Sequence, residues 1–335
     1  MSRMCLILTT AMATTTLGCM GETSSVNGPI EYDTVVHRPM AEIYADGHDA
    51  LVEAGVEVMR WGLTPYMLPE ELLVAYTPIA LFVERRLGVP VEVVLGDDYA
   101  DLESMLVAGE IDVGVISPYS YVRAKKASPD ITVFASHIAR GSFNYGSYII
   151  VKEESEIESL SDLAGQDVAF VDTRSTSGWL FPVARMLEEG VNPESDINPI
   201  FYGTHDRVFD AVVEGEVVAG ATYDGALSEG RQRRGDGWEV RVIAKGERIP
   251  HEAYVARAGL NRAVSQALST ALSEISTGTQ EGRRLLAPML RINGFLPVGD
   301  SHYDVIRLVE SQVNSADLSI ESGTAQPDLS NAVLE

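Results

Sequence analysis

The chain has 335 residues, of which 45% are hydrophobic and 22% charged, a balance typical of a globular protein with one or two packed cores. Its 25 basic and 49 acidic residues give a formal net charge of −24 at pH 7. Binding of a nucleic-acid backbone depends on clusters of Lys and Arg, which this sequence lacks, so the charge argues against such a partner. The same charge repels anions at long range, so any anion site must rely on local donors.

Residues 1–19 form a predicted export leader, in which Arg3 precedes an uncharged, Thr-rich apolar run that ends at Cys19. The ending Thr16-Leu17-Gly18-Cys19 resembles the bacterial lipoprotein signal, and this resemblance implies lipidation of Cys19. The protein is then expected in the periplasm or at the cell surface, held at the membrane by its N-terminal lipid. The alternative is an ordinary secretory leader. Residues 20–52 are expected to form a tether and an irregular segment.

From residue 53 onward, short apolar runs alternate with amphipathic stretches, which is the pattern of parallel sheets covered by helices. The first part predicts strands at residues 56–63, 91–95, 111–117 and 131–138, and helices at residues 69–87 and 99–108. A strand at residues 148–152 is expected to cross into a second lobe. That lobe holds predicted strands at residues 167–171, 199–202, 217–223 and 240–244, and predicted helices at residues 178–189 and 206–214.

The chain is expected to cross back near residues 249–255, after which helices at residues 262–275 and 303–313 pack on the first lobe. The predicted organisation is a first lobe of residues 53–147 plus 252–335 and a second lobe of residues 148–251. Two strands join the lobes, and a cleft separates them.

The most informative motif is Ser175-Thr176-Ser177-Gly178, which lies between a predicted buried strand and a helix. Backbone N–H groups at a helix start are free and carry partial positive charge, and the three hydroxyls add donors without a counter-charge. The motif therefore predicts a site for a tetrahedral oxyanion. The alternative is that one of these residues merely caps the helix.

His205 and Asp224 are expected at the same edge of the sheet as this turn, because each follows a predicted strand. This edge is where ligands bind in open α/β folds. A carboxylate repels a bound anion unless the ligand offers a proton or a cation, so Asp224 suggests a ligand with an acidic proton or an amino group. The alternatives are a structural histidine and an Asp-Gly turn.

Two tyrosines of the first lobe are further candidates. Tyr66 follows the first predicted strand, and Tyr121 opens the helix after Ser117-Pro118-Tyr119-Ser120. Their phenol hydroxyls can reach across the cleft, although ordinary packing is the alternative for each.

Together these stretches resemble the phosphate/phosphite/phosphonate ABC-transporter periplasmic substrate-binding proteins, over most of residues 60–259. The matching stretches are Trp61-Gly62-Leu63-Thr64-Pro65-Tyr66, Pro69-Glu70-Glu71, Gly109-Glu110-Ile111-Asp112, Ser175-Thr176-Ser177-Gly178-Trp179-Leu180-Phe181-Pro182, His205-Asp206 and Gly220-Ala221-Thr222-Tyr223-Asp224-Gly225. The resemblance implies an α/β, two-lobed, type II-like periplasmic binding protein. Each lobe is expected to contain a mainly parallel sheet with flanking helices, and two hinge strands join the lobes.

The resemblance also implies roles for individual residues and partners. A phosphorus oxyanion would be held by Ser175, Thr176, Ser177, His205, Tyr66 and Tyr121, with Asp224 and Glu252 as acidic residues of the pocket. The partners would be an ABC permease and its ATPase, and no metal or cofactor is expected. Closure of the hinge would trap the ligand.

Two other functions remain open from the sequence. The same lobes could report a ligand to a separate membrane receptor. A hydrolase built on Ser177, His205 and Asp224 is disfavoured, because the turn lacks the Gly-x-Ser-x-Gly pattern of a nucleophile elbow.

Overall fold

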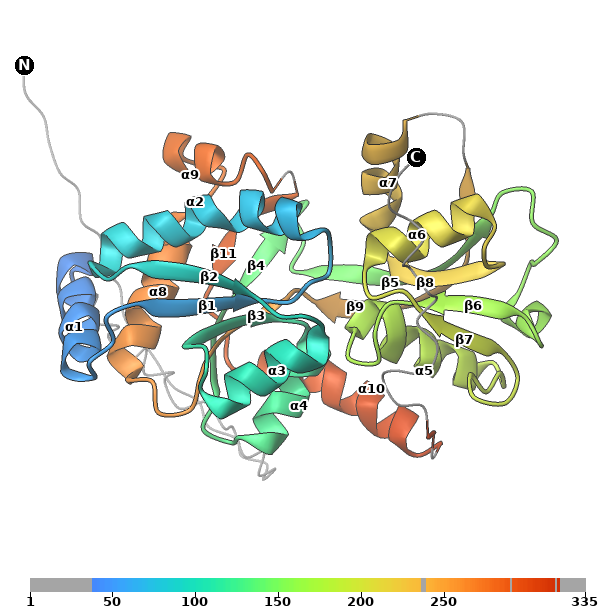
Figure 1. The fold of residues 1–335 in the computed structure, drawn as a ribbon, viewed down its shortest axis with the longest axis horizontal. Coiled ribbons are helices and arrows are strands. Elements are labelled where there is room, and N and C mark those ends of the chain that lie inside the picture. Colours follow the sequence, from blue (N-terminus) through green and yellow to red (C-terminus); the bar gives the residue numbers. More distant parts are fainter. Residues whose placement is uncertain (1–37, 236–238, 290, 317, 320–335) are drawn as a thin grey trace, which may run out of the picture. The chain divides into compact units, whose positions relative to one another are not determined.

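The computed structural model describes residues 38–235, 239–289, 291–316 and 318–319. Two β-sheets, each with helices on both faces, make up this part of the chain (Figure 1). The predicted leader, the lipidation site at Cys19 and most of the predicted tether lie outside the described residues. No helix in the described ranges combines the length and the apolar character needed to cross a bilayer.

The first sheet has six strands in the order β11-β4-β10-β3-β1-β2. Its strands are β1 (Met59–Leu63), β2 (Val91–Leu95), β3 (Val113–Ile116), β4 (Thr132–Ala139), β10 (Ala253–Ala256) and β11 (Ile292–Leu296). The strand β1 pairs in parallel with β2 and β3, whereas β10 is antiparallel to β3 and β4, and β11 is antiparallel to β4.

The second sheet has five strands in the order β7-β6-β8-β5-β9. Its strands are β5 (Asn144–Lys152), β6 (Asp167–Phe170), β7 (Asn198–Phe201), β8 (Ala219–Tyr223) and β9 (Val240–Pro250). The strand β6 is parallel to β7 and β8, and β5 is antiparallel to β8 and β9.

The expectation of mainly parallel sheets is therefore wrong, since both sheets are mixed. The reason is the pair of connections between them, from β4 to β5 and from β9 to β10. A strand that arrives from the other sheet starts at the edge where the parallel strands end, so β5 and β10 must run against their parallel neighbours. The connections lie at residues 140–143 and 251–252, whereas the crossings were expected at residues 148–152 and 249–255.

Helices cover both faces of each sheet. The first lobe contains α1 (Met40–Glu53), α2 (Pro69–Leu87), α3 (Tyr99–Ala108), α4 (Pro118–Ala127), α8 (Arg262–Glu274) and α9 (Gln280–Leu285). In the view of Figure 1, α2 lies above the first sheet, and α3 and α4 lie below it. The helix α2 begins at Pro69 with two acidic residues in its first turn and ends at Gly88, whose φ of 69° places it in the left-handed region, as the sequence predicts.

The second lobe contains a π-helical turn (Thr176–Leu180) that continues into α5 (Phe181–Glu188), followed by α6 (His205–Glu214) and α7 (Ala226–Arg234). The predicted helix at residues 178–189 thus starts earlier than expected and begins with a wider turn. The helix α6 is capped by Thr204, whose side chain accepts a hydrogen bond from the backbone N of Arg207.

Two further expectations need correction. Residues 40–53 form helix α1 rather than an irregular segment, and α1 packs on α8 through buried Ala50 and Leu51. The C-terminal helix α10 (Asp304–Asn314) contacts α5 and the π-helical turn of the second lobe as well as α4 of the first. Its buried face, with Ile306 and Val309, belongs to a hydrophobic cluster that includes side chains from both lobes, so α10 does not pack on the first lobe alone.

Candidate ligand-binding site

A cavity of about 280 Å³ is lined by residues from both lobes. The parallel strands of each sheet point their carboxyl ends toward it, as expected for ligand sites in open α/β sheets. All the predicted ligand residues except Tyr121 line this cavity, namely Tyr66, Ser175, Thr176, Ser177, His205, Asp224 and Glu252.

The turn after β6 is fixed by hydrogen bonds on several sides. Ser175 Oγ accepts from the backbone N of Gly178 at 3.1 Å, so Ser175 caps the π-helical turn and lines the cavity at once. Thr176 Oγ1 accepts from the backbone N of Tyr119 at 2.9 Å, and the Ser177 carbonyl accepts from Ser147 Oγ at 2.8 Å. These bonds hold the donors of the turn in a defined orientation.

Gly178 allows the turn to pack closely on β6. A Cβ atom added at Gly178 would lie 2.4 Å from Val171 Cγ2 and 2.9 Å from Ser175 Oγ. Both distances are too short for any side chain, so only glycine fits at this position.

His205 begins α6 at the cavity wall and is buried. Its Nδ1 lies 2.9 Å from Thr222 Oγ1, and its ring meets the Tyr223 ring edge to face at 4.7 Å between centroids. Burial, aided by the positive charge of Arg291, lowers the pKa of His205 to about 3. The ring is therefore neutral near pH 7, and it offers a single N–H rather than a positive charge.

Three tyrosines line the cavity: Tyr99, which is buried, and Tyr66 and Tyr145, which are half-buried. Burial raises the pKa of Tyr66. Burial raises the pKa of Tyr99, an effect that a hydrogen bond to Ser175 partly offsets. Burial likewise raises the pKa of Tyr145, partly offset by a hydrogen bond to Ser177. All three hydroxyls are therefore protonated donors at neutral pH, and two of them face the Ser-Thr-Ser turn.

Tyr121 does not belong to this site. It lies on α4 with its side chain fully buried, and its hydroxyl donates to Asp300 Oδ1 at 2.6 Å. Its ring also packs against the Tyr303 ring, with 5.0 Å between centroids. The expectation for Tyr121 is wrong because α4 turns this position toward the C-terminal segment. The first-lobe tyrosines that line the cavity are Tyr66 and Tyr99.

The cavity also contains a positive charge that sequence reasoning missed. Arg291 lines it, forms an ion pair with Glu229 of α7, and places its guanidinium 4.8 Å from the Tyr223 ring centroid. Burial lowers the pKa of Arg291, but Tyr223 and Glu229 raise it by more, so the net shift is upward and the group stays charged. The site is therefore not built from neutral donors alone. Nothing in the sequence around residue 291 signals this role, because it depends on contacts with the other lobe.

Asp224 and Glu252 are the acidic residues of the cavity. Asp224 Oδ2 accepts a hydrogen bond from the backbone N of Gly146 at 3.0 Å, so the carboxylate is fixed by the backbone and also lines the cavity. Glu252 Oε2 lies 3.3 Å from Nε2 of His137.

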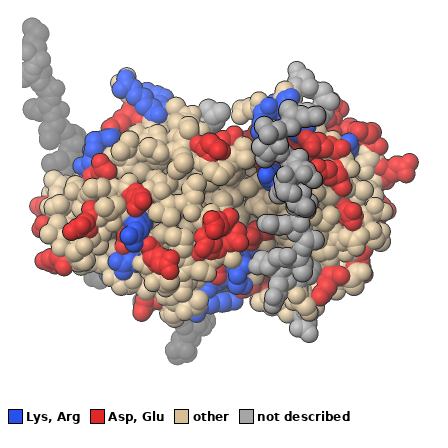
Figure 2. Space-filling model, viewed as in Figure 1, with Lys and Arg blue, Asp and Glu red and all other residues tan. Residues whose placement is uncertain are grey.

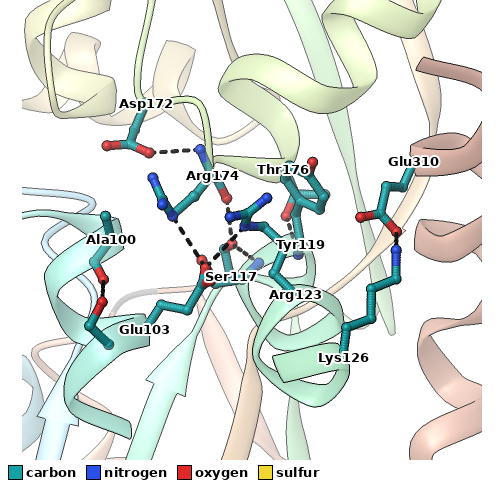
Figure 3. Close-up of polar contacts among 12 residues, drawn as sticks. Ala100, Glu103, Ser117, Tyr119, Arg123, Lys126, Asp172, Arg174, Thr176 and Glu310 are labelled. Atoms are coloured by element: carbon teal, nitrogen blue, oxygen red, sulfur yellow. Dashed lines mark hydrogen bonds and ion pairs between the residues drawn. The ribbon is translucent and has the colours of Figure 1, made fainter. Parts of the chain in front are cut away.

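Direct contacts join the two lobes beside the cavity (Figure 3). Ser117 Oγ, at the start of α4, donates to the Arg174 carbonyl at 2.8 Å, and Glu103 of α3 lies 3.3 Å from the Arg174 guanidinium. A further cross-lobe bond runs from the backbone N of His205 to the Tyr66 carbonyl at 3.3 Å. The structure thus shows the lobes in contact around the cavity.

Figure 2 shows one face of the molecule, on which acidic side chains are spread widely and basic ones form small groups among them. This face carries no broad basic surface of the kind that binds a nucleic-acid backbone. The result agrees with the net charge of the chain.

Two mixed α/β lobes, joined by two connections and enclosing a cavity lined by hydrogen-bond donors, define a two-lobed substrate-binding protein. The family model described as "ABC transporter, phosphonate, periplasmic substrate-binding protein" matches residues 61–303. The chain belongs to this family. It is therefore a binding component of a transport system and not an enzyme.

Two characterised relatives support this assignment. The chain is 31% identical over 272 residues to the phosphate-import protein PhnD of Mycolicibacterium smegmatis, covering 76% of this chain and 85% of that protein. It is 26% identical over 218 residues to the phosphonates-binding periplasmic protein of Escherichia coli, covering 63% of this chain and 64% of that protein.

Solved structures confirm the fold. A binding protein component of an ABC phosphonate transporter from Pseudomonas aeruginosa aligns with a TM-score of 0.69 at 20% identity, covering 78% of this chain and 89% of that one. PhnD1 from Prochlorococcus marinus, in complex with methylphosphonate, aligns with a TM-score of 0.69 at 18% identity, covering 77% of this chain and 98% of that one.

Proposed function

We propose that this protein captures a phosphonate, phosphite or phosphate anion in the cavity between its lobes and delivers it to an ABC permease and its ATPase. The observation that carries the proposal is convergence at one cavity: the Ser175–Ser177 turn, neutral His205 and the tyrosines of the facing wall all offer donors there. The names of the two characterised relatives point to the same class of ligand.

In this proposal the anion docks on the turn and on the start of α6, and the first lobe closes over it. Ser175, Thr176, Ser177 and His205 hold the oxygens from the second lobe, and Tyr66 donates from the first. Asp224 and Glu252 face the part of the ligand that carries a proton or an amino group. An oxygen missing from the ligand would leave a buried donor without a partner, at a cost of about 1 to 3 kcal/mol.

Isothermal titration with phosphate, phosphite, methylphosphonate and 2-aminoethylphosphonate tests this function. We expect Ser177→Ala and His205→Ala each to weaken binding of the preferred ligand at least tenfold, because each removes one donor (about 1.4 kcal/mol per tenfold). The melting temperature should change little. Tyr121→Phe serves as the matched control, since it removes a buried hydroxyl outside the cavity and should leave the affinity unchanged. Unaltered affinity in both donor variants would refute the site.

The N-terminus is proposed to carry a lipid on Cys19, which would tether the protein to a membrane on the outer side of the cell. The support is the sequence Thr16-Leu17-Gly18-Cys19 at the end of an export leader. In cell fractionation, the wild-type chain is expected with the membranes and Cys19→Ser among the soluble proteins. Equal partition of both proteins would argue for an ordinary secretory leader.

A further inference from the structure

Three metal-binding side chains cluster on one wall of the cavity. His137 lies on β4, and His251 and Glu252 form the connection from β9 to β10. One ligand atom from each residue lies within 4.8 Å of the others, and His137 Nε2 is 3.3 Å from Glu252 Oε2. The 3.3 Å separation matches two corners of a tetrahedron around an ion with bonds of about 2.0 Å, the usual Zn–N and Zn–O length. The separations of up to 4.8 Å must shorten by about 1.5 Å when the ion binds, through a shift of the side chains.

The two histidines carry ring nitrogens with unmet hydrogen-bonding capacity. Each residue is only 6% exposed, and the rings stack with 4.5 Å between centroids. Among the described residues, His251 Nε2 is buried and has no hydrogen-bond partner, whereas the unpartnered nitrogen of His137 is Nδ1 and not the Nε2 that lies beside Glu252. Buried polar atoms without partners are costly and rare in native proteins, so the unpartnered Nε2 of His251 beside the cavity indicates a missing ligand.

The charge of this wall suits a cation. Arg291 opposes a cation nearby, but its charge is engaged by Glu229, and Asp224 and Glu252 add negative charge to the same cavity.

We propose that His137, His251 and Glu252 bind one divalent transition-metal ion of the zinc class, with a coordination position left open toward the cavity. Two imidazoles and one carboxylate with an open position are an established ligand set for Zn²⁺. An oxyanion in the cavity supplies an oxygen to the open position, and this second part rests on the proposed function. The metal then offsets the repulsion between the anion and the two carboxylates.

The test begins with the full-length chain dialysed against EDTA and titrated with Zn²⁺ alone. We expect one equivalent to bind, with a rise in melting temperature because the ion binds only the folded protein. His137→Ala and His251→Ala should each weaken Zn²⁺ binding at least tenfold, and Glu252→Gln, which preserves the shape of the side chain, should also weaken it. The matched control is His302→Ala, because His302 also has a buried ring nitrogen without a hydrogen-bond partner but lies outside the cavity.

A parallel titration of methylphosphonate with and without Zn²⁺ separates this inference from the proposed function. Tighter methylphosphonate binding in the presence of Zn²⁺ is expected. No stoichiometric Zn²⁺ binding, or binding that all three cluster variants retain, overturns the metal site, even if methylphosphonate binds normally. A second result would also overturn the metal site. In it, the protein binds no Zn²⁺, yet metal-free protein binds 2-aminoethylphosphonate tightly and the cluster variants lose that binding. The ammonium group of the ligand would then occupy the place of the ion.

Discussion

In Arg291→Gln, methylphosphonate affinity is expected to fall at least a hundredfold. The substitution removes the least exposed of the three arginines that line the cavity, the others being Arg140 and Arg248, and leaves Glu229 without its ion-pair partner. The Arg291 and Glu229 side chains are only 24% and 21% exposed. Truncating one partner of a charge pair withdrawn from solvent typically costs about 2 to 5 kcal/mol, and about 2.8 kcal/mol corresponds to a hundredfold change in affinity. Isothermal titration measures this effect directly, and thermal unfolding should show a parallel loss of stability.

The double variant Arg291→Gln with Glu229→Gln separates stability from binding. Removing both charges should restore most of the melting temperature, because no unpaired charge remains buried. Affinity should stay low, since the guanidinium of Arg291 is still missing. If the double variant binds methylphosphonate as tightly as the wild type, Arg291 serves only to neutralise Glu229.

Gly178→Ala is expected to abolish measurable methylphosphonate binding. The new methyl group would lie 2.4 Å from Val171 Cγ2 and 2.9 Å from Ser175 Oγ, so the turn must move away from β6. A shift of that size takes the hydroxyl and N–H donors of residues 175–177 out of line with the anion. Overpacking of this kind also costs about 1 to 3 kcal/mol of stability, which chemical denaturation can measure.

Gly299→Ala provides the matched control for this change. Its Cβ atom would meet nothing within 4 Å, and its φ of −109° suits any residue. Adding Val171→Gly to Gly178→Ala should recover part of the affinity, because it removes the two shortest contacts, 2.4 Å to Val171 Cγ2 and 2.6 Å to Val171 Cβ. Normal binding by Gly178→Ala alone would show that the turn does not hold the ligand.

Most strands and helices could be predicted from the sequence because hydrophobic periodicity and the residues that end helices are local signals, but α1, α7, α9 and β11 were not predicted. Gly88 and Gly109, both with positive φ, end α2 and α3 where predicted. The direction of each strand relative to its neighbours could not be predicted from these local signals. The antiparallel course of β10 follows from the return of the chain between lobes, which periodicity does not encode.

The candidate site likewise contains residues that local sequence signals predict and residues that they do not. The Ser175–Ser177 turn and His205 lie at ends of parallel strands, and topology alone places them together. Tyr121 was misplaced because its sequence position does not reveal which side of α4 faces the cavity. Arg291 and His137 are brought to the cavity by long-range packing, and no local pattern marks them as site residues.

The hydroxyl of Thr176 affects which ligands the protein can accept. It receives the backbone N–H of Tyr119 from the opposite lobe, while its neighbours on either side face the cavity. A ligand large enough to displace the turn would move Thr176 Oγ1 away from the backbone N–H of Tyr119. That N–H would lose its acceptor, and the lobes would be held apart. Under the proposed function, this hydrogen bond between the lobes makes their closure depend on the size of the bound ligand.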